Sequence, residues 1–374
     1  MRIGIDARMY GKGFGLARYI EQLVLHLEKL DTENEYIIFL RKENWNAFQP
    51  MSRNFKKVLA DISWYSFGEQ LQFPRIIKKE KIDLMHFPHF NVPIFYRDPY
   101  IVTIHDLIMF HYPRQEASTH GPLSYWFKDK IHRAVVWNAV SRAKHILVTS
   151  EFTKKDVHTT LKVPLEKMTV TYQAPFVPQI VQNHDAQALL SKYTLTKPYI
   201  MYVGAAYPHK NLEGLLKAWG VFQKKYGEKH QLVLVGKENF FYTKLKNTVL
   251  PQYKDVVYTG FVGDDDLQGL YKEASLYVFP SLYEGFGLPP LEAMTQGVPV
   301  ASSDKSCLPE VLGDAALYFD PENSEAIADT LFEGMTNETL RSVLKTKAQI
   351  LLPRYSWETL ARQTLHIYRE VRGD

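Results

Sequence analysis

The feature that most constrains the fold is a repeated alternation of short apolar runs with longer amphipathic stretches. This alternation is typical of βαβ units, in which crossover helices join parallel strands. In the first half, the predicted strands are Arg2–Asp6, Tyr36–Leu40, Leu84–Phe87, Tyr100–Ile104 and His145–Thr149. The helical periodicity predicts helices at Gly15–Leu30, Ser124–Ala143 and Thr153–Leu161. The first half therefore predicts one parallel sheet covered by helices.

The same alternation begins again after a proline-containing segment near Val177–Lys197 that has little strand or helix pattern. The second half predicts a helix at Leu212–Tyr226. Its predicted strands are Tyr199–Val203, Gln231–Val235, Val256–Thr259, Leu276–Phe279 and Val298–Ala301. We predict an α/β protein with two Rossmann-like, doubly wound domains, 1–185 and 186–355, that face a central cleft. Residues 356–374 predict a terminal helix with Ser356 as its N-cap.

Composition limits the classes of function. Hydrophobic residues make up 45% of the 374 residues and charged residues 23%, which is typical of a globular protein. A net charge of +4 is too small to indicate nucleic-acid binding, but it suits an anionic ligand or membrane surface. The single cysteine, Cys307, excludes an internal disulfide. No apolar run is long enough to cross a bilayer, and no secretory signal is evident, so we expect a cytoplasmic protein.

The segment "PSLYEGFGLPPLEAMTQGVPV" carries two glutamates, Glu284 and Glu292, around a glycine turn. The apolar run before it predicts a buried strand, and Pro289–Pro290 predict the start of a helix. Gly285 and Gly287 then lie in the turn, where free backbone amides at a helix N-terminus favour phosphate or hydroxyl groups. A carboxylate binds paired sugar hydroxyls well because it accepts two hydrogen bonds. An ordinary glycine turn with a dipole-stabilising glutamate is an equally weighted alternative.

A second candidate follows the strand that ends at Gly204. Lys210 lies in the next loop, and Asn211 is the predicted cap of the helix that begins at Leu212. A lysine at this end of a sheet can bind phosphate. Lys237 follows the next strand in the same way, although a loop lysine is more often simply solvated.

The early glycines Gly11, Gly13 and Gly15 form a flexible loop before a helix, as in phosphate-binding turns. Their spacing is not the dinucleotide fingerprint, and no acidic residue ends the second strand, so NAD is disfavoured.

His105 and Asp106 follow a predicted strand, at the end of the sheet where active-site groups collect. His105 can hydrogen-bond a substrate hydroxyl or a leaving group, and a core histidine with satisfied hydrogen bonds is the alternative. The histidines show no metal-binding spacing, so no catalytic metal is expected.

A basic and aromatic segment occupies residues 111–137. It interleaves Tyr125, Trp126, Phe127 and Trp137 with Arg114, Lys128, Lys130 and Arg133. Such a segment can lie on a lipid interface or stack on a sugar ring. We favour a buried helix with a solvated basic face.

Taken together, these motifs resemble the retaining glycosyltransferases of family 4, which have the GT-B architecture. The resemblance covers nearly the whole chain. The family's pair of glutamates matches Glu284 and Glu292, and its lysine-asparagine element matches Lys210–Asn211. Further similar segments are "TIHD", "TSEFTKKD", "VYTGFVGDDDLQGLY" and "YSWETLARQTLHIYREV".

The resemblance implies a role for each candidate. Lys210 would bind the donor diphosphate, Glu292 the ribose, and Glu284 the donor sugar, while His105 would lie near the transferred sugar. Residues implied to act through their backbone are Gly13, Gly15, Phe286, Gly287 and Leu288 around the diphosphate and sugar, and Gly260, Phe261 and Val262 around the base. The terminal helix would cross back to the first domain, which would be the acceptor side.

The chain departs from the family pattern at one point. A second basic residue usually precedes the lysine, but here only His209 does, and Lys237 is the candidate substitute. A nucleophilic role for Glu284, as in two-carboxylate glycosidases, is the less favoured mechanism.

The resemblance implies transfer of a hexose, with GDP-mannose as the expected donor, to a glycan or lipid-linked saccharide. The expectation includes no metal cofactor and no nucleic-acid partner, and it includes peripheral contact with the inner face of the cell membrane. The alternatives are a UDP-sugar-dependent transferase, a nucleotide-sugar epimerase on the same fold, and a catalytically silent carbohydrate-binding protein.

Overall fold

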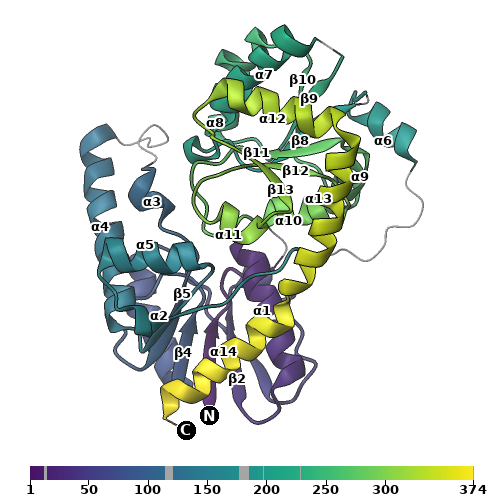
Figure 1. Cartoon of the computed structure of the whole chain (residues 1–374). Coiled ribbons are helices and arrows are strands. Elements are labelled where there is room, and N and C mark those ends of the chain that lie inside the picture. The colour runs from purple at the N-terminus through teal and green to yellow at the C-terminus, as the bar shows by residue number, and fades with distance from the viewer. Residues whose placement is uncertain (12–14, 114–120, 177–184, 197, 228, 374) are drawn as a thin grey trace. The chain divides into compact units, whose positions relative to one another are not determined.

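The computed structural model describes residues 1–11, 15–113, 121–176, 185–196, 198–227 and 229–373. The chain forms two compact units, each built around its own parallel sheet (Figure 1). The N-terminal unit comprises Met1–Phe110, Ser118–Gln173 and Ser356–Asp374, and the C-terminal unit comprises His111–Ala117 and Ala174–Tyr355. Within the described ranges, every helix is too short or too polar to span a lipid bilayer.

The N-terminal unit contains a seven-stranded sheet in the order β3-β2-β1-β4-β5-β6-β7 within the described part of the chain. All neighbouring strands pair in parallel. The strands are β1 (Arg2–Asp6), β2 (Glu35–Leu40), β3 (Phe55–Leu59), β4 (Leu84–Phe87), β5 (Tyr100–Ile104), β6 (His145–Val148) and β7 (Met168–Val170). The central strands β4 and β5 are buried along their whole length, which requires helices on both faces of the sheet.

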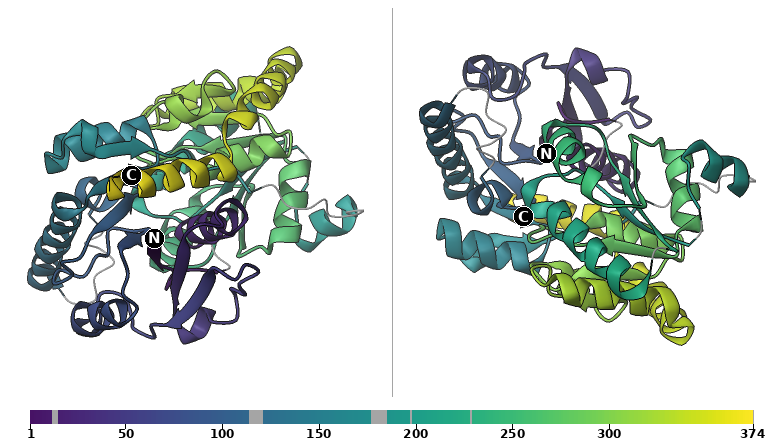
Figure 2. Two further views of the ribbon diagram at one scale, coloured as in Figure 1. Left: turned by 90° about the horizontal axis from the view of Figure 1, so that it is seen from below. Right: turned by 90° about the horizontal axis from the view of Figure 1, so that it is seen from above.

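The helices of the N-terminal unit connect these strands and include the last helix of the chain. They are α1 (Leu16–Leu30), α2 (Phe67–Lys79), α3 (Ile108–His111), α4 (Gly121–Arg142), α5 (Glu151–Leu161) and α14 (Trp357–Arg372). Helix α14 packs beside α1, as Figures 1 and 2 show in yellow and purple. Its fully buried Tyr368 hydroxyl lies 2.7 Å from Nδ1 of His86, on β4. Ser356 caps α14 as predicted, accepting a hydrogen bond from the Thr359 amide at 3.3 Å.

The C-terminal unit contains a six-stranded parallel sheet in the order β10-β9-β8-β11-β12-β13 within the described residues. The strands are β8 (Tyr199–Val203), β9 (Gln231–Val235), β10 (Val256–Gly260), β11 (Leu276–Phe279), β12 (Val300–Ser303) and β13 (Ala316–Phe319). The order of the strands reverses between β8 and β11, because β9 and β10 follow β8 to one side and β12 and β13 follow β11 to the other. Ligands of doubly wound sheets bind at such a switch point.

Helices cover both faces of this sheet too, because β8 and β11 are buried along their whole length. The helices are α6 (Ala186–Lys192), α7 (Leu212–Tyr226), α8 (Phe240–Thr248), α9 (Asp264–Glu273), α10 (Leu288–Thr295), α11 (Leu308–Leu312), α12 (Ser324–Thr336) and α13 (Glu338–Leu351). Helices α7 and α12 pack against each other, with the Tyr226 and Phe332 rings stacked at a centroid distance of 3.8 Å. The fold class predicted from the sequence, α/β with two doubly wound sheets, is confirmed.

The predicted strands agree with the observed ones to within two residues, and the largest difference is at β12. The strand expected at Val298–Ala301 begins at Val300 and ends at Ser303. Gly297 has a φ of 71°, and Pro299 has no amide hydrogen to donate to the ladder, so before Val300 only the Pro299 carbonyl pairs, accepting from the Tyr277 amide of β11 at 2.9 Å.

Candidate functional site

The predicted site residues of the C-terminal unit follow the carboxyl ends of four neighbouring strands. Lys210 follows β8, Lys237 follows β9, the Gly260–Val262 turn begins at the last residue of β10, and Glu284 follows β11. Because parallel strands end at the same edge of a sheet, these groups lie along one edge, with Lys210 and Glu284 on the two sides of the switch point.

Lys210 and Glu284 form an ion pair, with 2.5 Å between Nζ and Oε1. Their side chains are only 17% and 8% exposed. The Lys210 ammonium also lies over the Phe279 ring, 5.3 Å from its centroid. A partly buried cation and carboxylate therefore face each other at the switch point, where doubly wound sheets bind their ligands.

Backbone contacts bring these two loops together. The Leu282 amide donates a hydrogen bond to the His209 carbonyl at 2.7 Å, so the loop after β11 is tied to the loop after β8. The Glu284 amide donates to Oγ of Ser306 at 3.0 Å. Ser306 follows β12 and has a φ of 57°. Its role was missed at the sequence level, where the only signal was a run of small polar residues after a strand.

The turn between Glu284 and α10 has the predicted form. Gly287 is the N-cap of α10, with a φ of 88°, and a side chain there would clash with Leu308 at 2.8 Å. Gly285 and Phe286 are buried, and Leu288 is the first residue of the helix. Glu292 lies just after the first helical turn and is partly buried. The prolines at 289 and 290 occupy the first turn, where no amide hydrogen bond is lost.

Glycines allow the strand ends of this unit to approach closely. A Cβ on Gly236 would lie 2.2 Å from the carbonyl oxygen of Gly204, and Gly204 itself has a φ of 153°. The hydroxyl of the buried Tyr242 donates to the Gly204 carbonyl at 2.9 Å. The hydroxyl of the partly buried Tyr258 donates to the Gly236 carbonyl at 3.0 Å. Their rings stack at 4.6 Å. These hydrogen bonds fix the backbone at the ends of β8 and β9, the strands that precede Lys210 and Lys237.

One prediction about the loop after β8, the capping role of Asn211, needs correction. Asn211 occupies the N-cap position of α7, but its side chain does not cap the helix. It has a φ of 56° and donates instead to the Pro321 carbonyl at 2.7 Å, because the left-handed backbone turns the amide away from the helix amides. His209 is 1% exposed, with its ring stacked on Tyr207 at 5.9 Å, which makes it a poor phosphate ligand. Lys237, in contrast, is exposed.

The turn predicted to hold the base combines an exposed and a buried residue. Gly260 ends β10 with a φ of 73°, Phe261 is 61% exposed and Val262 is 2% exposed. A flat, solvated phenyl ring on a fixed turn is suited to stacking on a planar group.

The remaining candidates lie in the N-terminal unit. Gly11 and Gly15 both have positive φ values, 128° and 65°, and Gly15 is the N-cap of α1. Gly13, between them, lies outside the described residues. His105 follows β5 as predicted and is partly buried.

Both ring nitrogens of His105 are engaged. Nε2 donates to the Pro88 carbonyl at 2.8 Å, so Nδ1 is the acceptor for the Gln173 side-chain amide at 3.1 Å. The Tyr19 ring contacts the imidazole edge-on at 4.7 Å. Burial lowers the pKa of His105 to about 4, although the Pro88 carbonyl opposes this shift. His105 is therefore neutral at pH 7, and a substrate hydroxyl must replace one of these partners to reach it.

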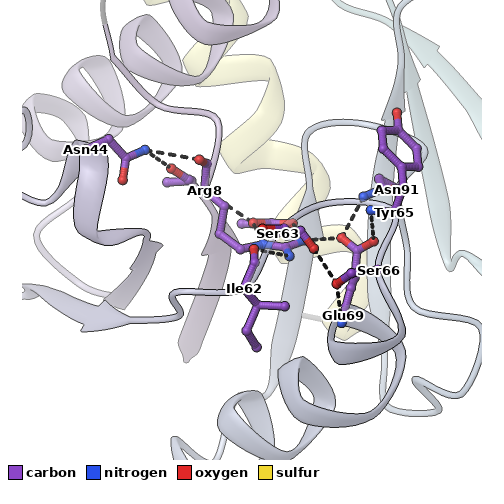
Figure 3. A network of polar contacts seen from close by, with 10 residues as sticks. Arg8, Asn44, Ile62, Ser63, Tyr65, Ser66, Glu69 and Asn91 are labelled. Carbon is purple, nitrogen blue, oxygen red and sulfur yellow. Dashed lines mark hydrogen bonds and ion pairs between the residues drawn. The ribbon is translucent and has the colours of Figure 1, made fainter.

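A buried polar network lies behind the loop that follows β1, and sequence reasoning missed it. Arg8 is 1% exposed and binds Asp6 through two 2.8 Å contacts. It also binds Glu69 at 2.7 Å, and both of these residues are labelled in Figure 3. The Asn44 amide donates to the carbonyls of Ala7, Arg8 and Tyr10 at 3.1, 3.2 and 2.9 Å. These bonds fix the chain just before the glycine loop.

The basic and aromatic segment differs from the favoured prediction. Arg114 and the side chain of Tyr125 lie outside the described residues. Trp126, Phe127 and Trp137 on α4 are 59%, 61% and 58% exposed, so these aromatic side chains are not buried. The helix packs instead through small aliphatic residues: Val136, Ala139 and Val140.

Comparison with known proteins identifies the family of the chain. Residues 15–174 match the model of Glycosyltransferase Family 4, and residues 190–350 match that of Glycosyl transferases group 1. O-antigen chain mannosyltransferase B of Escherichia coli is 30% identical over 300 residues, covering 76% of this chain and 74% of that protein. O-antigen chain mannosyltransferase RfbU of Salmonella typhimurium is 28% identical over 270 residues, covering 72% and 69%.

Solved structures share the fold at low identity. A sucrose-phosphate synthase from Thermosynechococcus elongatus superposes with a TM-score of 0.72 at 18% identity, covering 100% of this chain and 99% of that one. WaaG, a glycosyltransferase involved in lipopolysaccharide biosynthesis, gives a TM-score of 0.72 at 15% identity, with 98% and 99% covered. The GT-B type of two Rossmann-like domains is confirmed. The chain belongs to the family 4 glycosyltransferases.

Proposed function

We propose that this glycosyltransferase moves a mannosyl group from GDP-mannose to a hydroxyl of a glycan or lipid-linked saccharide, with retention of configuration. The observation that carries the proposal is the Lys210–Glu284 pair at the switch point of the C-terminal sheet. Two relatives that are O-antigen chain mannosyltransferases support mannose as the sugar.

The geometry suggests how the pair works. A diphosphate entering this edge competes with Glu284 for the Lys210 ammonium, because phosphate is also an anion and carries more charge. Glu284, once released, can accept hydrogen bonds from two hydroxyls of the donor sugar. Lys210 would then stabilise the negative charge that develops as the nucleoside diphosphate leaves.

We further propose that Glu292 binds the ribose hydroxyls, and that the amides of Gly287 and Leu288 bind the diphosphate or sugar at the N-terminus of α10. Lys237 would supply the second cation in place of the buried His209. The acceptor would attack the face from which the diphosphate leaves. With one lysine at the phosphate and a second near it, a resident divalent cation is not required.

The proposal is tested by ligand binding and by transfer. GDP-mannose or GDP should raise the thermal unfolding temperature by mass action, more than UDP- or ADP-sugars do. Lys210→Met should lower kcat/KM by about 100-fold or more, as loss of a group that stabilises developing charge does. Lys225→Met is the matched control, since Lys225 pairs with Asp329 at 2.6 Å on the outer surface of the same unit.

Several results of these binding and transfer measurements would contradict the proposed function or favour an alternative. No stabilisation by any nucleotide, or full transfer activity in Lys210→Met, would contradict the donor site. Stabilisation by UDP-sugars alone would favour the UDP-dependent alternative. Conversion of the donor to another nucleotide sugar in the absence of acceptor would identify an epimerase.

We also propose that the N-terminal unit contacts an anionic membrane through α4. Its exposed aromatic rings, Trp126, Phe127 and Trp137, are suited to a lipid interface, and Lys128 and Lys130 would attract anionic headgroups. Wild-type protein should co-sediment with vesicles containing 30% phosphatidylglycerol, and a Trp126→Ser/Phe127→Ser variant should not. Equal sedimentation of the two would refute this contact. Membrane contact of this kind would place the protein at the inner face of the cell membrane.

A further inference from the structure

The loop between β3 and α2 presents an aromatic residue in a strained conformation. Tyr65 has a φ of 58°, a left-handed backbone that an aromatic residue rarely adopts, yet its side chain is 65% exposed. Phe67, the first residue of α2, is 89% exposed. Neither ring is needed for the core, so packing does not explain why an aromatic residue rather than glycine or asparagine occupies position 65.

A fully buried ion pair holds this backbone in place. The Tyr65 amide donates to Oε2 of Glu69 at 2.8 Å, and Oε1 of Glu69 binds Nη2 of Arg8 at 2.7 Å (Figure 3). Glu69 and Arg8 are each 1% exposed. Ser66 then caps α2, accepting from the Glu69 amide at 3.2 Å. Residues kept in sparsely populated conformations by an over-determined surrounding structure occur most often at ligand-binding sites.

The Glu69 carboxylate connects the loop between β3 and α2 to the carboxyl ends of other strands, where active-site groups collect. Arg8 follows β1, and Asn91, which donates to Oε1 of Glu69 at 2.6 Å, follows β4. His105 follows β5, the neighbour of β4. The strand end of β1 is therefore two strand spacings, about 10 Å, from that of β5. This distance exceeds the width of one sugar ring.

We propose that Tyr65, with Phe67, forms an aromatic platform that stacks on a sugar ring of an oligosaccharide acceptor. The inference rests on the proposed function, in which a hydroxyl near His105 is glycosylated. Tyrosine suits this role because its ring supplies a large contact area with little conformational entropy to lose, and its hydroxyl can bind a sugar hydroxyl. The fixed backbone would present the ring in one orientation.

The neighbouring aromatic residue is less suited to this role. The guanidinium of Arg41 lies over the Trp64 ring, 4.8 Å from its centroid, so one face of that indole is already covered. The Tyr65 loop follows β3, and Glu69 bonds it to residues that follow β1 and β4, not to β5, which precedes His105. We therefore expect the platform to contact a sugar beyond the one that is glycosylated. It should therefore matter for oligosaccharide acceptors and not for a monosaccharide.

The test compares two acceptors and three variants in transfer from GDP-mannose. The acceptors are α-linked mannotriose and methyl α-mannoside. Tyr65→Asn removes the ring but keeps a residue that tolerates positive φ, so its thermal unfolding temperature should equal or exceed that of the wild type. Tyr65→Phe keeps the ring. Phe240→Ala, at a 52% exposed position in the C-terminal unit, controls for the loss of any exposed aromatic residue.

We expect Tyr65→Asn to raise KM for mannotriose about five- to tenfold, the range of one aromatic stacking contact, with kcat changed less than twofold. Its KM for methyl α-mannoside should be unchanged, and Tyr65→Phe and Phe240→Ala should behave as wild type. Equal losses with both acceptors, or no change with mannotriose, would overturn the proposal.

Calorimetry of mannotriose binding tests the aromatic platform independently of the proposed donor site. If wild-type protein neither binds GDP nor transfers mannose, the proposed function fails, and calorimetry of mannotriose binding still tests the platform. Weaker binding to Tyr65→Asn than to wild type supports it, whereas equal binding, or no binding to either, overturns it. Loss of binding to anionic vesicles instead of mannotriose would assign the rings to a lipid surface and would also overturn the saccharide proposal.

Discussion

Replacing Glu69 with Gln tests whether the buried network of the N-terminal unit holds its loops in place. Glu69 accepts three hydrogen bonds: from Arg8 at 2.7 Å, from Asn91 at 2.6 Å and from the Tyr65 amide at 2.8 Å. A carboxylate can accept all three. A glutamine of the same shape has only one acceptor oxygen, so its NH2 group must face at least one of these donors.

The magnitude follows from how many buried groups lose a partner. An unsatisfied buried donor costs about 1–3 kcal/mol, and breaking a buried ion pair costs about 3–5 kcal/mol. Arg8 keeps Asp6, which binds it through two contacts of 2.8 Å, so the guanidinium is not left without an anion. We therefore expect Glu69→Gln to lower the unfolding free energy of the N-terminal unit by about 2–3 kcal/mol.

The measurement must resolve the two units, because they need not unfold in one transition. Hydrogen exchange in urea, followed by mass spectrometry on peptides from β1 and α2, reports the N-terminal unit alone. Lys56→Met is the control, since Lys56 pairs with Glu35 at 2.6 Å but is 59% exposed, and a surface pair contributes about 0–1 kcal/mol. A loss in Glu69→Gln no larger than that in the control would refute the reasoning.

Three further predictions concern other parts of the molecule. Gly236→Ala should lower the unfolding free energy of the C-terminal unit by about 1–3 kcal/mol and weaken GDP binding, because its Cβ would lie 2.2 Å from the Gly204 carbonyl. The control is Gly68→Ala, which should not destabilise the protein because its Cβ would have no neighbour closer than 3.5 Å. Equal losses of unfolding free energy for the two variants in urea titrations would contradict this prediction. Burial, with His105 nearby, lowers the pKa of His86 to about 3, so the folded state stays neutral while the unfolded chain binds a proton below about pH 6.5. His86 should then contribute about 1 kcal/mol to the loss of stability as the pH is lowered from 6.5 to 5.5, and other buried histidines such as His105 add their own contributions. The loss should therefore be about 1 kcal/mol smaller in His86→Gln, and the same pH dependence in both proteins would disprove the assignment. The rate of mannosyl transfer should be unchanged by EDTA, because Lys210 would supply the positive charge at the leaving diphosphate. Loss of activity in EDTA that only a divalent cation restores would contradict that role of Lys210.

Sequence patterns revealed the buried strands better than the exposed ones. Strands β5, β8 and β11 are buried along their length, and they appear in the sequence as plain apolar runs. Strand β3, "FKKVL", lies at the edge of its sheet and carries two lysines, so no apolar pattern marked it. Helix α2 was missed as well, because Pro74 lies inside it and proline usually ends a helix.

The candidate site was predictable to the extent that its residues follow strands. Lys210 and Glu284 could be placed at one sheet edge because parallel strands end together, and their ion pair fits that placement. The residues that fix the loops around the candidate site, such as Ser306 and Glu69, could not be found from strand positions. Ser306 contacts a residue 22 positions away, and Glu69 contacts one 61 positions away. Such pairings depend on the folded loops and leave no local periodicity. The capping role expected for Asn211 failed for the same reason, since its partner is 110 positions away.

The most direct test of the account is proton NMR of GDP-mannose incubated with mannotriose and the wild-type protein. The account predicts that the donor's anomeric signal disappears while GDP and one new α-anomeric mannosyl signal appear together, in equal amounts. A new β-anomeric signal would contradict retention, and an unchanged donor signal would contradict transfer from GDP-mannose.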